Sequence, residues 1–113
     1  MAAIIAGADF VDWLESGPRG DRRSARILVC TMADGGRLTL PVHVVVGSQS
    51  GPLVVFLACQ HGNEILPVFG LRRIWDDLNA EEMSGTVVIV PVANPMAFEH
   101  GSRGAPMEGL WAD

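Results

Sequence analysis

Positive charge is scarce in this sequence of 113 residues: 8 Lys and Arg residues stand against 13 Asp and Glu residues, for a net charge of −5. The basic residues form no run, which argues against nucleic acid or an anionic membrane surface as a partner. Apolar runs long enough to cross a bilayer are also lacking. The apolar start at residues 1–7 has no positively charged segment, so it does not read as a signal peptide. We therefore expect a cytoplasmic protein that binds neither nucleic acid nor a membrane.

Cysteine is equally scarce, and there is no internal repeat. The two cysteines, Cys30 and Cys59, are far apart and lie in apolar, strand-like runs. For a cytosolic chain this pattern favours two buried free thiols over a disulfide. The length allows one small domain, and a hydrophobic content of 49% is enough to build its core.

The most informative stretch covers residues 53–64. Leu53–Cys59 is a continuous apolar run, which predicts a strand buried on both faces. A polar break follows, and then a helix is expected over about residues 64–79. Its apolar stripe comprises Ile65, Val68, Leu71, Trp75 and Leu78. A second buried strand is expected at Thr86–Val92, so the unit predicts a right-handed crossover between parallel strands.

The first half of the chain predicts an antiparallel hairpin. Strand-like residues 25–32 and 37–46 flank Asp34-Gly35-Gly36, a strong turn signal. Pro41 suggests an edge position or a bulge in the second of these strands. A short helix is expected at residues 9–15 and a loop at residues 96–113. The fold class is therefore α/β, with a mixed sheet made of the hairpin and the parallel β-α-β unit.

His61 and Glu64 lie at the carboxyl end of the first buried strand, where open α/β sheets place their ligands. Their spacing allows both side chains to point at one ion. Imidazole and carboxylate are donors that a catalytic zinc ion takes. The alternative is a polar turn in which Glu64 stabilises the amino end of the helix through its dipole.

Arg103 follows the second parallel strand, so its loop should open on the same edge of the sheet as His61. Its guanidinium can grip a substrate carboxylate or stabilise an oxyanion, or it can be an ordinary surface arginine. His100, in the same loop, is either an improvised third ligand or a solvated side chain. His43, on the polar face of its strand, is expected at the surface. Glu99, Glu108 and Asp113 have no assigned partner.

Several segments, taken together, resemble the succinylglutamate desuccinylase/aspartoacylase family, a branch of the zinc carboxypeptidase-like fold. The resemblance runs from about Leu38 to Asp113 and depends on the order and spacing of the pieces. They are Leu40-Pro41-Val42, Gly51-Pro52, the apolar strand into His61-Gly62-Asn63-Glu64, Gly85 with a Val/Ile strand, Asn94-Pro95-x-Ala97-Phe98, and Gly101-Ser102-Arg103.

The resemblance implies roles for four residues. His61 and Glu64 match the family's first two zinc ligands. Arg103 matches the arginine that polarises the scissile carbonyl and stabilises the tetrahedral intermediate. Asn94 matches a turn that shapes the substrate pocket. The implied function is zinc-dependent hydrolysis of the amide bond of an N-acyl amino acid or a similar small amide, with residues 1–113 as the N-terminal part of the catalytic domain.

Two family features have no counterpart: a third zinc ligand, which is a later histidine, and a general-base glutamate. Glu108 stands where the family's Pro-x-Asp-Gly has Asp, and Asp113 falls at the start of its Asp-Leu-Asn-Arg segment. We therefore expect one weakly held zinc ion and no appreciable hydrolysis by this chain alone. The alternatives are a zinc carboxypeptidase and a non-catalytic truncated relative. The latter would bind a metal or ligand, or cover its open sheet with another subunit or copy.

Overall fold

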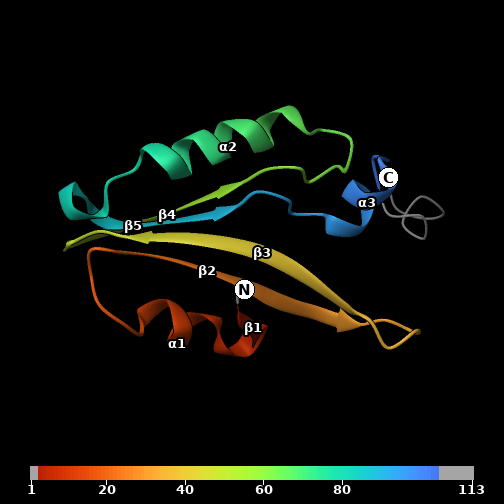
Figure 1. Cartoon of the computed structure of the whole chain (residues 1–113), viewed down its shortest axis with the longest axis horizontal. Coiled ribbons are helices and arrows are strands. Elements are labelled where there is room, and N and C mark those ends of the chain that lie inside the picture. Colours follow the sequence, from red (N-terminus) through yellow and green to blue (C-terminus); the bar gives the residue numbers. More distant parts are fainter. Residues whose placement is uncertain (1–2, 105–113) are drawn as a thin grey trace.

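A computed structural model describes residues 3–104 of the chain. The protein is a five-stranded mixed sheet with the strand order β1-β2-β3-β5-β4 and a helix on each face (Figure 1). The strands are β1 (Ala3–Ala6), β2 (Asp21–Thr31), β3 (Arg37–Val46), β4 (Gln49–Leu57) and β5 (Ser84–Val90). The helices are α1 (Phe10–Glu15), α2 (Leu66–Asp77) and α3 (Pro95–His100), with 3-10 turns η1 (Gly7–Asp9) and η2 (Ala80–Glu82).

Strands β2 and β3 form the predicted antiparallel hairpin, and β1 pairs with β2 in parallel. In the turn between β2 and β3, the Gly36 N–H donates to Asp34 Oδ1 at 2.7 Å, and Gly35 adopts a φ of 86°. Pairing between β3 and β5 begins at His43, so Pro41 lies outside that ladder. Proline therefore stands where β3 needs no N–H for a second neighbour.

The β4-α2-β5 unit is the predicted parallel crossover, and the mixed α/β architecture is confirmed. Helix α2 begins at Leu66 rather than Glu64, because residues 61–64 form a turn in which the Glu64 N–H donates to His61 O at 3.0 Å. Pro67 lies in the first helical turn, where its missing N–H costs least.

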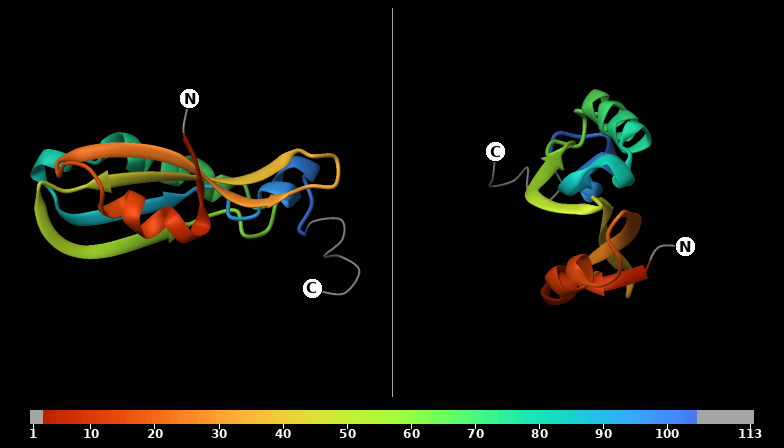
Figure 2. Two further views of the ribbon diagram at one scale, coloured as in Figure 1. Left: turned by 90° about the horizontal axis from the view of Figure 1, so that it is seen from below. Right: turned by 90° about the vertical axis from the view of Figure 1, so that its left-hand side faces the viewer.

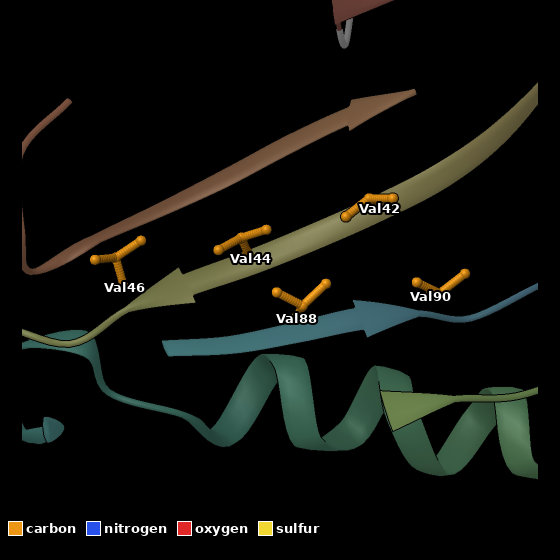
Figure 3. Close-up of a cluster of buried hydrophobic side chains, with 5 residues drawn as sticks. All are labelled: Val42, Val44, Val46, Val88 and Val90. Carbon is orange, nitrogen blue, oxygen red and sulfur yellow. The ribbon is translucent and has the colours of Figure 1, made fainter. Parts of the chain in front are cut away.

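One core lies between the sheet and α1. Its centre is a set of buried valines from the adjacent strands β3 and β5, Val42, Val44, Val46, Val88 and Val90 (Figure 3). Phe10, Trp13 and Leu14 of α1 pack against them, as the sequence pattern predicts for this short helix. The alternation of side chains along β3 therefore directs its apolar face towards α1.

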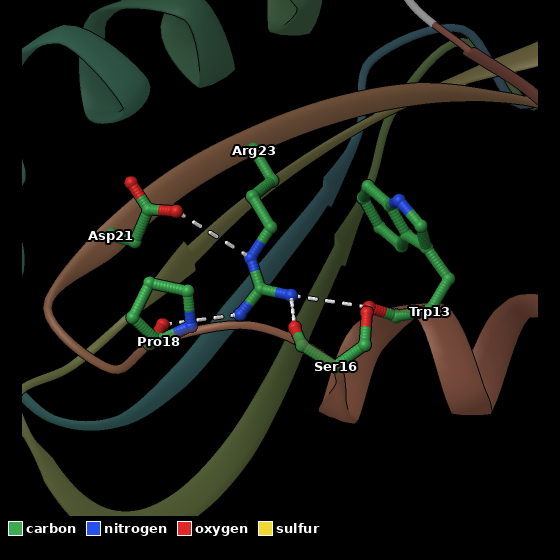
Figure 4. A network of polar contacts seen from close by, with 5 residues as sticks. All are labelled: Trp13, Ser16, Pro18, Asp21 and Arg23. Carbon is green, nitrogen blue, oxygen red and sulfur yellow. Dashed lines mark hydrogen bonds and ion pairs between the residues drawn. The ribbon is translucent and has the colours of Figure 1, made fainter.

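Arg23 of β2 forms hydrogen bonds with the end of α1 and the turn that follows it (Figure 4). Its guanidinium donates to the backbone oxygens of Trp13, at 3.1 Å, and of Ser16 and Pro18. The side chain is 14% exposed, and Asp21 lies 3.8 Å away. A mostly buried charge is thus matched by carbonyl acceptors at a helix end, where carbonyls lack helical partners.

A second core lies on the opposite face, under α2. Ala58, Leu71 and Ile89 are its buried residues. Val68, Ile74 and Trp75 of the helix pack around them. The predicted apolar stripe of the helix thus covers the sheet, although Ile65 at its start remains 45% exposed.

The prediction that Leu53–Cys59 is a strand buried on both faces is wrong, because the side chains of β4 are exposed. Leu53, Val55 and Leu57 are 57%, 51% and 53% exposed, and Phe56 is 37% exposed. The reason is its position: β4 is the outermost strand of the described sheet and has β5 as its single neighbour there (Figure 2). Burial begins only at Ala58 and Cys59, just past the strand.

Two smaller expectations also need correction. Both cysteines are free, but Cys30 is exposed and only Cys59 is buried. Residues 95–100 form helix α3 instead of loop, because Asn94 caps the helix, Pro95 opens it and Gly101 ends it in the left-handed conformation. Within residues 3–104, no helix has the length and apolar character needed to cross a membrane.

Candidate functional site

His61 and Glu64 lie in the turn that follows β4, and the structure brings their side chains together. His61 Nδ1 and Glu64 Oε1 are 3.0 Å apart, which is hydrogen-bonding distance. The side chains are 38% and 53% exposed, so the pair is open to solvent and to a ligand. In this arrangement the imidazole Nδ1–H donates to the carboxylate.

Cys59 makes the sharp bend that leads into this turn. It is buried and has a φ of 55°, the left-handed region that residues other than glycine rarely adopt. Its Sγ lies 3.4 Å from His61 O and 3.6 Å from Gly62 O. Burial raises the pKa of the Cys59 thiol, and the Glu64 carboxylate raises it further. The neutral thiol is thus a donor to the backbone of the turn rather than a nucleophile.

The loop after β5 supplies the other side of the site. Its first residues are tied to the end of β4, since the Asn94 N–H donates to Cys59 O at 3.1 Å. The Asn94 side chain then caps α3 by accepting from the Ala97 N–H at 3.2 Å. At the far end of α3, the Ser102 N–H donates to Ala97 O at 3.1 Å. Asn94 is therefore a structural residue of the site in this arrangement.

The two loops meet directly. The Gly62 N–H donates to Arg103 O at 3.1 Å, so the backbone of Arg103 lies beside the His61–Glu64 turn. Arg103 itself is exposed. The expectation that both loops open on one edge of the sheet is thus met, because β4 and β5 run in parallel and end together.

The donors fit a zinc ion in type and spacing. Zinc takes imidazole nitrogen and carboxylate oxygen as ligands, and His61 Nδ1 and Glu64 Oε1 lie 3.0 Å apart, so these two side chains would hold the ion. The described part of the chain contains no group of three His, Cys, Asp or Glu residues that could hold a metal ion. His100 is therefore not grouped with the pair in the described residues, and its Nδ1–H donates to Met96 O at 2.8 Å. Glu108 and Asp113 lie outside the described residues.

His43 is not the surface residue that its strand pattern predicts. It is half-buried, with its ring 5.1 Å from that of Trp75 and its Nδ1 2.7 Å from Ser24 Oγ. Burial lowers the pKa of His43, and the charges of Arg26 and Arg72 lower it further. It lines an open cavity of about 350 Å³ under α2, with Arg72, Trp75 and Asp76 among the other walls. Strand alternation alone could not show that α2 overhangs this part of β3.

Known proteins resemble this chain over the part that carries the site. The profile of the succinylglutamate desuccinylase/aspartoacylase catalytic domain matches residues 50–110, which is more than half of the chain. Over 74 residues the sequence is 35% identical to an N-alpha-acetyl-L-2,4-diaminobutyric acid deacetylase of Halomonas elongata, covering 66% of this chain and 21% of that protein.

Solved structures give a similar result. An aspartoacylase family protein of Mesorhizobium loti superposes with a TM-score of 0.70 at 28% identity, covering 85% of this chain and 29% of that one. A succinylglutamate desuccinylase/aspartoacylase of Rhodobacter sphaeroides gives a TM-score of 0.66 at 27% identity, with 78% and 28% covered. The chain thus spans between a fifth and a third of the length of these relatives.

Proposed function

The chain belongs to the succinylglutamate desuccinylase/aspartoacylase catalytic domain family, and from this membership we propose that it forms part of a zinc-dependent hydrolase of carbon–nitrogen amide bonds. The proposed substrates are N-acyl amino acids or similar small amides. The relative named as a deacetylase of an acetylated diamino acid supports this class. The observation that carries the proposal is the convergence of His61 Nδ1 and Glu64 Oε1 to 3.0 Å beside the Arg103 loop.

His61 and Glu64 are the proposed zinc ligands. When bound, the ion would act as a Lewis acid that polarises the amide carbonyl and activates water. For the imidazole to ligate through Nδ1, the proton that it donates to Glu64 must leave that atom. Moving this proton to Nε2 keeps the ring neutral and releases no proton, while zinc binding should weaken as the pH falls because protons compete with the ion for its ligands.

Arg103 is proposed to face the substrate. Its loop is fixed next to the ligand pair through Gly62, and its side chain is exposed at that edge. A guanidinium there can bind the charge that develops on the carbonyl oxygen, or hold a substrate carboxylate in a bidentate grip. Asn94 would contribute indirectly, by capping α3 and so shaping the wall of the pocket.

The described residues supply two ligands, while a catalytic zinc site needs three and a general base as well. We propose that the third ligand and the general base are supplied by segments other than residues 1–113. The isolated chain of residues 1–113 should then bind zinc weakly and hydrolyse no amide at a measurable rate. Turnover by that chain, lost with a chelator and restored by zinc, would overturn this part of the proposal.

A second candidate function is favoured by the exposed apolar side chains of β4. A strand with an open edge and a bare face is a site for association, either with the remainder of the domain or with a second copy. A non-catalytic relative of this kind would form a stable, monodisperse dimer in sedimentation without binding zinc. A zinc carboxypeptidase would instead cleave the C-terminal residue of a peptide.

The decisive experiment is an assay of the complete enzyme, in which this chain is joined to the segments proposed to supply the third ligand and the general base. The substrates are N-acetyl amino acids, with N-acetyl-2,4-diaminobutyrate among them, and zinc is added. We expect acetate release that stops with a chelator. His61→Ala and Glu64→Gln should each lower kcat/KM by at least about a hundredfold, since each removes a ligand. His100→Gln, which changes a nearby exposed histidine outside the pair, is the matched control. Equal activity of His61→Ala and His100→Gln would reject the zinc assignment.

We also propose that the protein works in the cytoplasm. The exposed free thiol of Cys30 is compatible with a reducing compartment.

A further inference from the structure

We infer that Gly62 is a positioning residue that joins the turn carrying His61 and Glu64 to the loop carrying Arg103, so that the two loops move as one unit. The inference rests on the proposed function, because the coupling affects catalysis only if His61, Glu64 and Arg103 have the roles proposed above. Its physical content, however, is a coupling between two segments that can be measured without metal or substrate. Gly62 itself offers no side chain to a ligand, so any effect of changing it must pass through its neighbours.

The first observation is a close backbone contact. Gly62 is buried, and a Cβ built on it would overlap the carbonyl carbon and oxygen of Ala97 and the carbonyl oxygen of Ser102. These atoms belong to the backbone, so they cannot turn aside as a flexible side chain would. Ala97 is 0% exposed and therefore has no space to retreat into. Only glycine allows the turn to approach α3 this closely.

The second observation is that Gly62 binds the segment that it touches. Its N–H donates to Arg103 O, and the same segment is closed by the bonds from Ser102 N–H to Ala97 O and from Gly101 N–H to Phe98 O. The Ala97–Arg103 backbone thus contacts Gly62 and also sets the position of Arg103. A displacement of Gly62 would be transmitted to both sides of the site.

The turn needs this support because of where it starts. It follows β4, which is exposed along its length and has β5 as its one partner among the described strands. Cys59 supports the turn from within through its Sγ contacts to His61 O and Gly62 O. The bond from Gly62 to Arg103 ties the turn to the other loop of the site. Gly62 therefore joins the two halves of the site at the ligand turn itself, beyond the bond from Asn94 N–H to Cys59 O at their base.

The test replaces Gly62 with alanine and follows hydrogen exchange of the metal-free protein. We expect exchange to rise by about tenfold or more in peptides covering both 61–64 and 101–104, with β3 unchanged. Gly70→Ala is the matched control, because a Cβ at Gly70 in α2 meets nothing within 4 Å. An increase confined to one of the two loops, or none in either, would overturn the inference.

A second measurement covers the case in which Gly62→Ala does not fold. In the unaltered protein, native-state exchange in low denaturant should give the Gly62 and Ser102 amides one common opening free energy. If Gly62 opens at a clearly lower free energy than Ser102, the loops are independent and the inference is wrong.

The failure of this inference can be told apart from a failure of the proposed function. If the unaltered protein binds no zinc, the function is rejected, while the coupling in metal-free exchange still stands or falls on its own. If zinc binds, Gly62→Ala should weaken its affinity, measured by competition with a chromophoric chelator, and Gly70→Ala should leave it unchanged. Equal zinc affinity in the two variants would count against the positioning role even where activity is lost.

Discussion

Strands β4 and β5 run in parallel, pair with each other and have nearly the same apolar composition, yet their surroundings are opposite. Val88 and Ile89 in β5 are 3% and 1% exposed, while their partners Val55 and Phe56 in β4 are 51% and 37% exposed. The difference comes from neighbours: β5 lies between β3 and β4 and under helices on both faces, whereas β4 is outermost in the described sheet. Burial of a strand is thus decided by its position in the sheet as much as by its sequence.

The site combines one loop from each of these strands. The turn with His61 and Glu64 follows the exposed strand, and the loop with Arg103 follows the buried one. The turn should therefore be stabilised by its contacts with α3 and the loop that follows β5, rather than by β4.

The largest effect is expected for a cavity in the buried strand. Ile89→Ala should lower the free energy of unfolding by about 2–5 kcal/mol, because it truncates a core side chain that is 1% exposed. Leu57→Ala in β4, where the side chain is 53% exposed, should cost less than about 1 kcal/mol. Urea unfolding of both variants measures the difference. Equal losses would show that β4 is as well covered as β5.

A smaller effect is expected for the cap of α3. Asn94→Ala should lower stability by about 0.5–2 kcal/mol and raise hydrogen exchange in residues 61–64, because α3 supports the turn. Asn79→Ala is the matched control: Asn79 Oδ1 accepts from the Glu81 N–H at 3.1 Å, so that variant removes a similar cap away from the site. Unchanged exchange at residues 61–64 in Asn94→Ala would show that the turn is secured by other contacts.

A pH effect is expected from His43. Its pKa lies below the ordinary value of 6.5 because burial, Arg26 and Arg72 disfavour the charged ring. The unfolded chain therefore takes up this proton first as the pH falls below 6.5, and the folded state loses stability from there until the lowered pKa is passed. Asp76, which lines the same cavity, is the nearby charge of opposite sign.

His43→Gln should flatten this dependence while leaving the stability above neutral pH nearly unchanged. Unfolding in urea at a series of pH values measures it, and His100→Gln, at an exposed position, is the control. The assignment fails if His43→Gln and the unaltered protein lose stability in parallel between neutral and acid pH.

The smallest effect on folding is expected on the bare face of β4. Val55→Thr should change stability by less than about 0.5 kcal/mol, because the side chain is half-exposed and threonine is also β-branched. It should nonetheless reduce self-association, measured by sedimentation of the concentrated protein. A large destabilisation would mean that something covers this face in solution.

Much of the fold follows from periodicity in the sequence. The hairpin turn at Asp34, the alternation along β3 and the stripe of α2 each depend on residues close in the chain, so they were predictable. The position of β4 was not, because an apolar run reads alike in the middle and at the rim of a sheet. Helix α3 could have been found, since Asn94, Pro95 and Gly101 are ordinary start and stop signals within a segment that also reads as loop.

Some features of the site could likewise be predicted from the sequence, and others could not. The convergence of His61 and Glu64 and the shared edge with Arg103 follow from a three-residue spacing and from parallel strands. The burial of His43 depends on the overhang of α2, and the contact of Gly62 with Ala97 depends on how two distant loops pack. Neither has a local signature in the sequence.

The strand order also has a consequence during protein synthesis. Strands β2 and β3 are adjacent in sequence and can pair as soon as both have left the ribosome. The apolar residues Leu53–Leu57 emerge next, but their partner β5 begins only at Ser84. Until β5 has been synthesised, this apolar strand is unpaired and can associate with other nascent chains or with chaperones. Slower translation of residues 58–90 should therefore lower the soluble yield, and co-expressed chaperones should restore it.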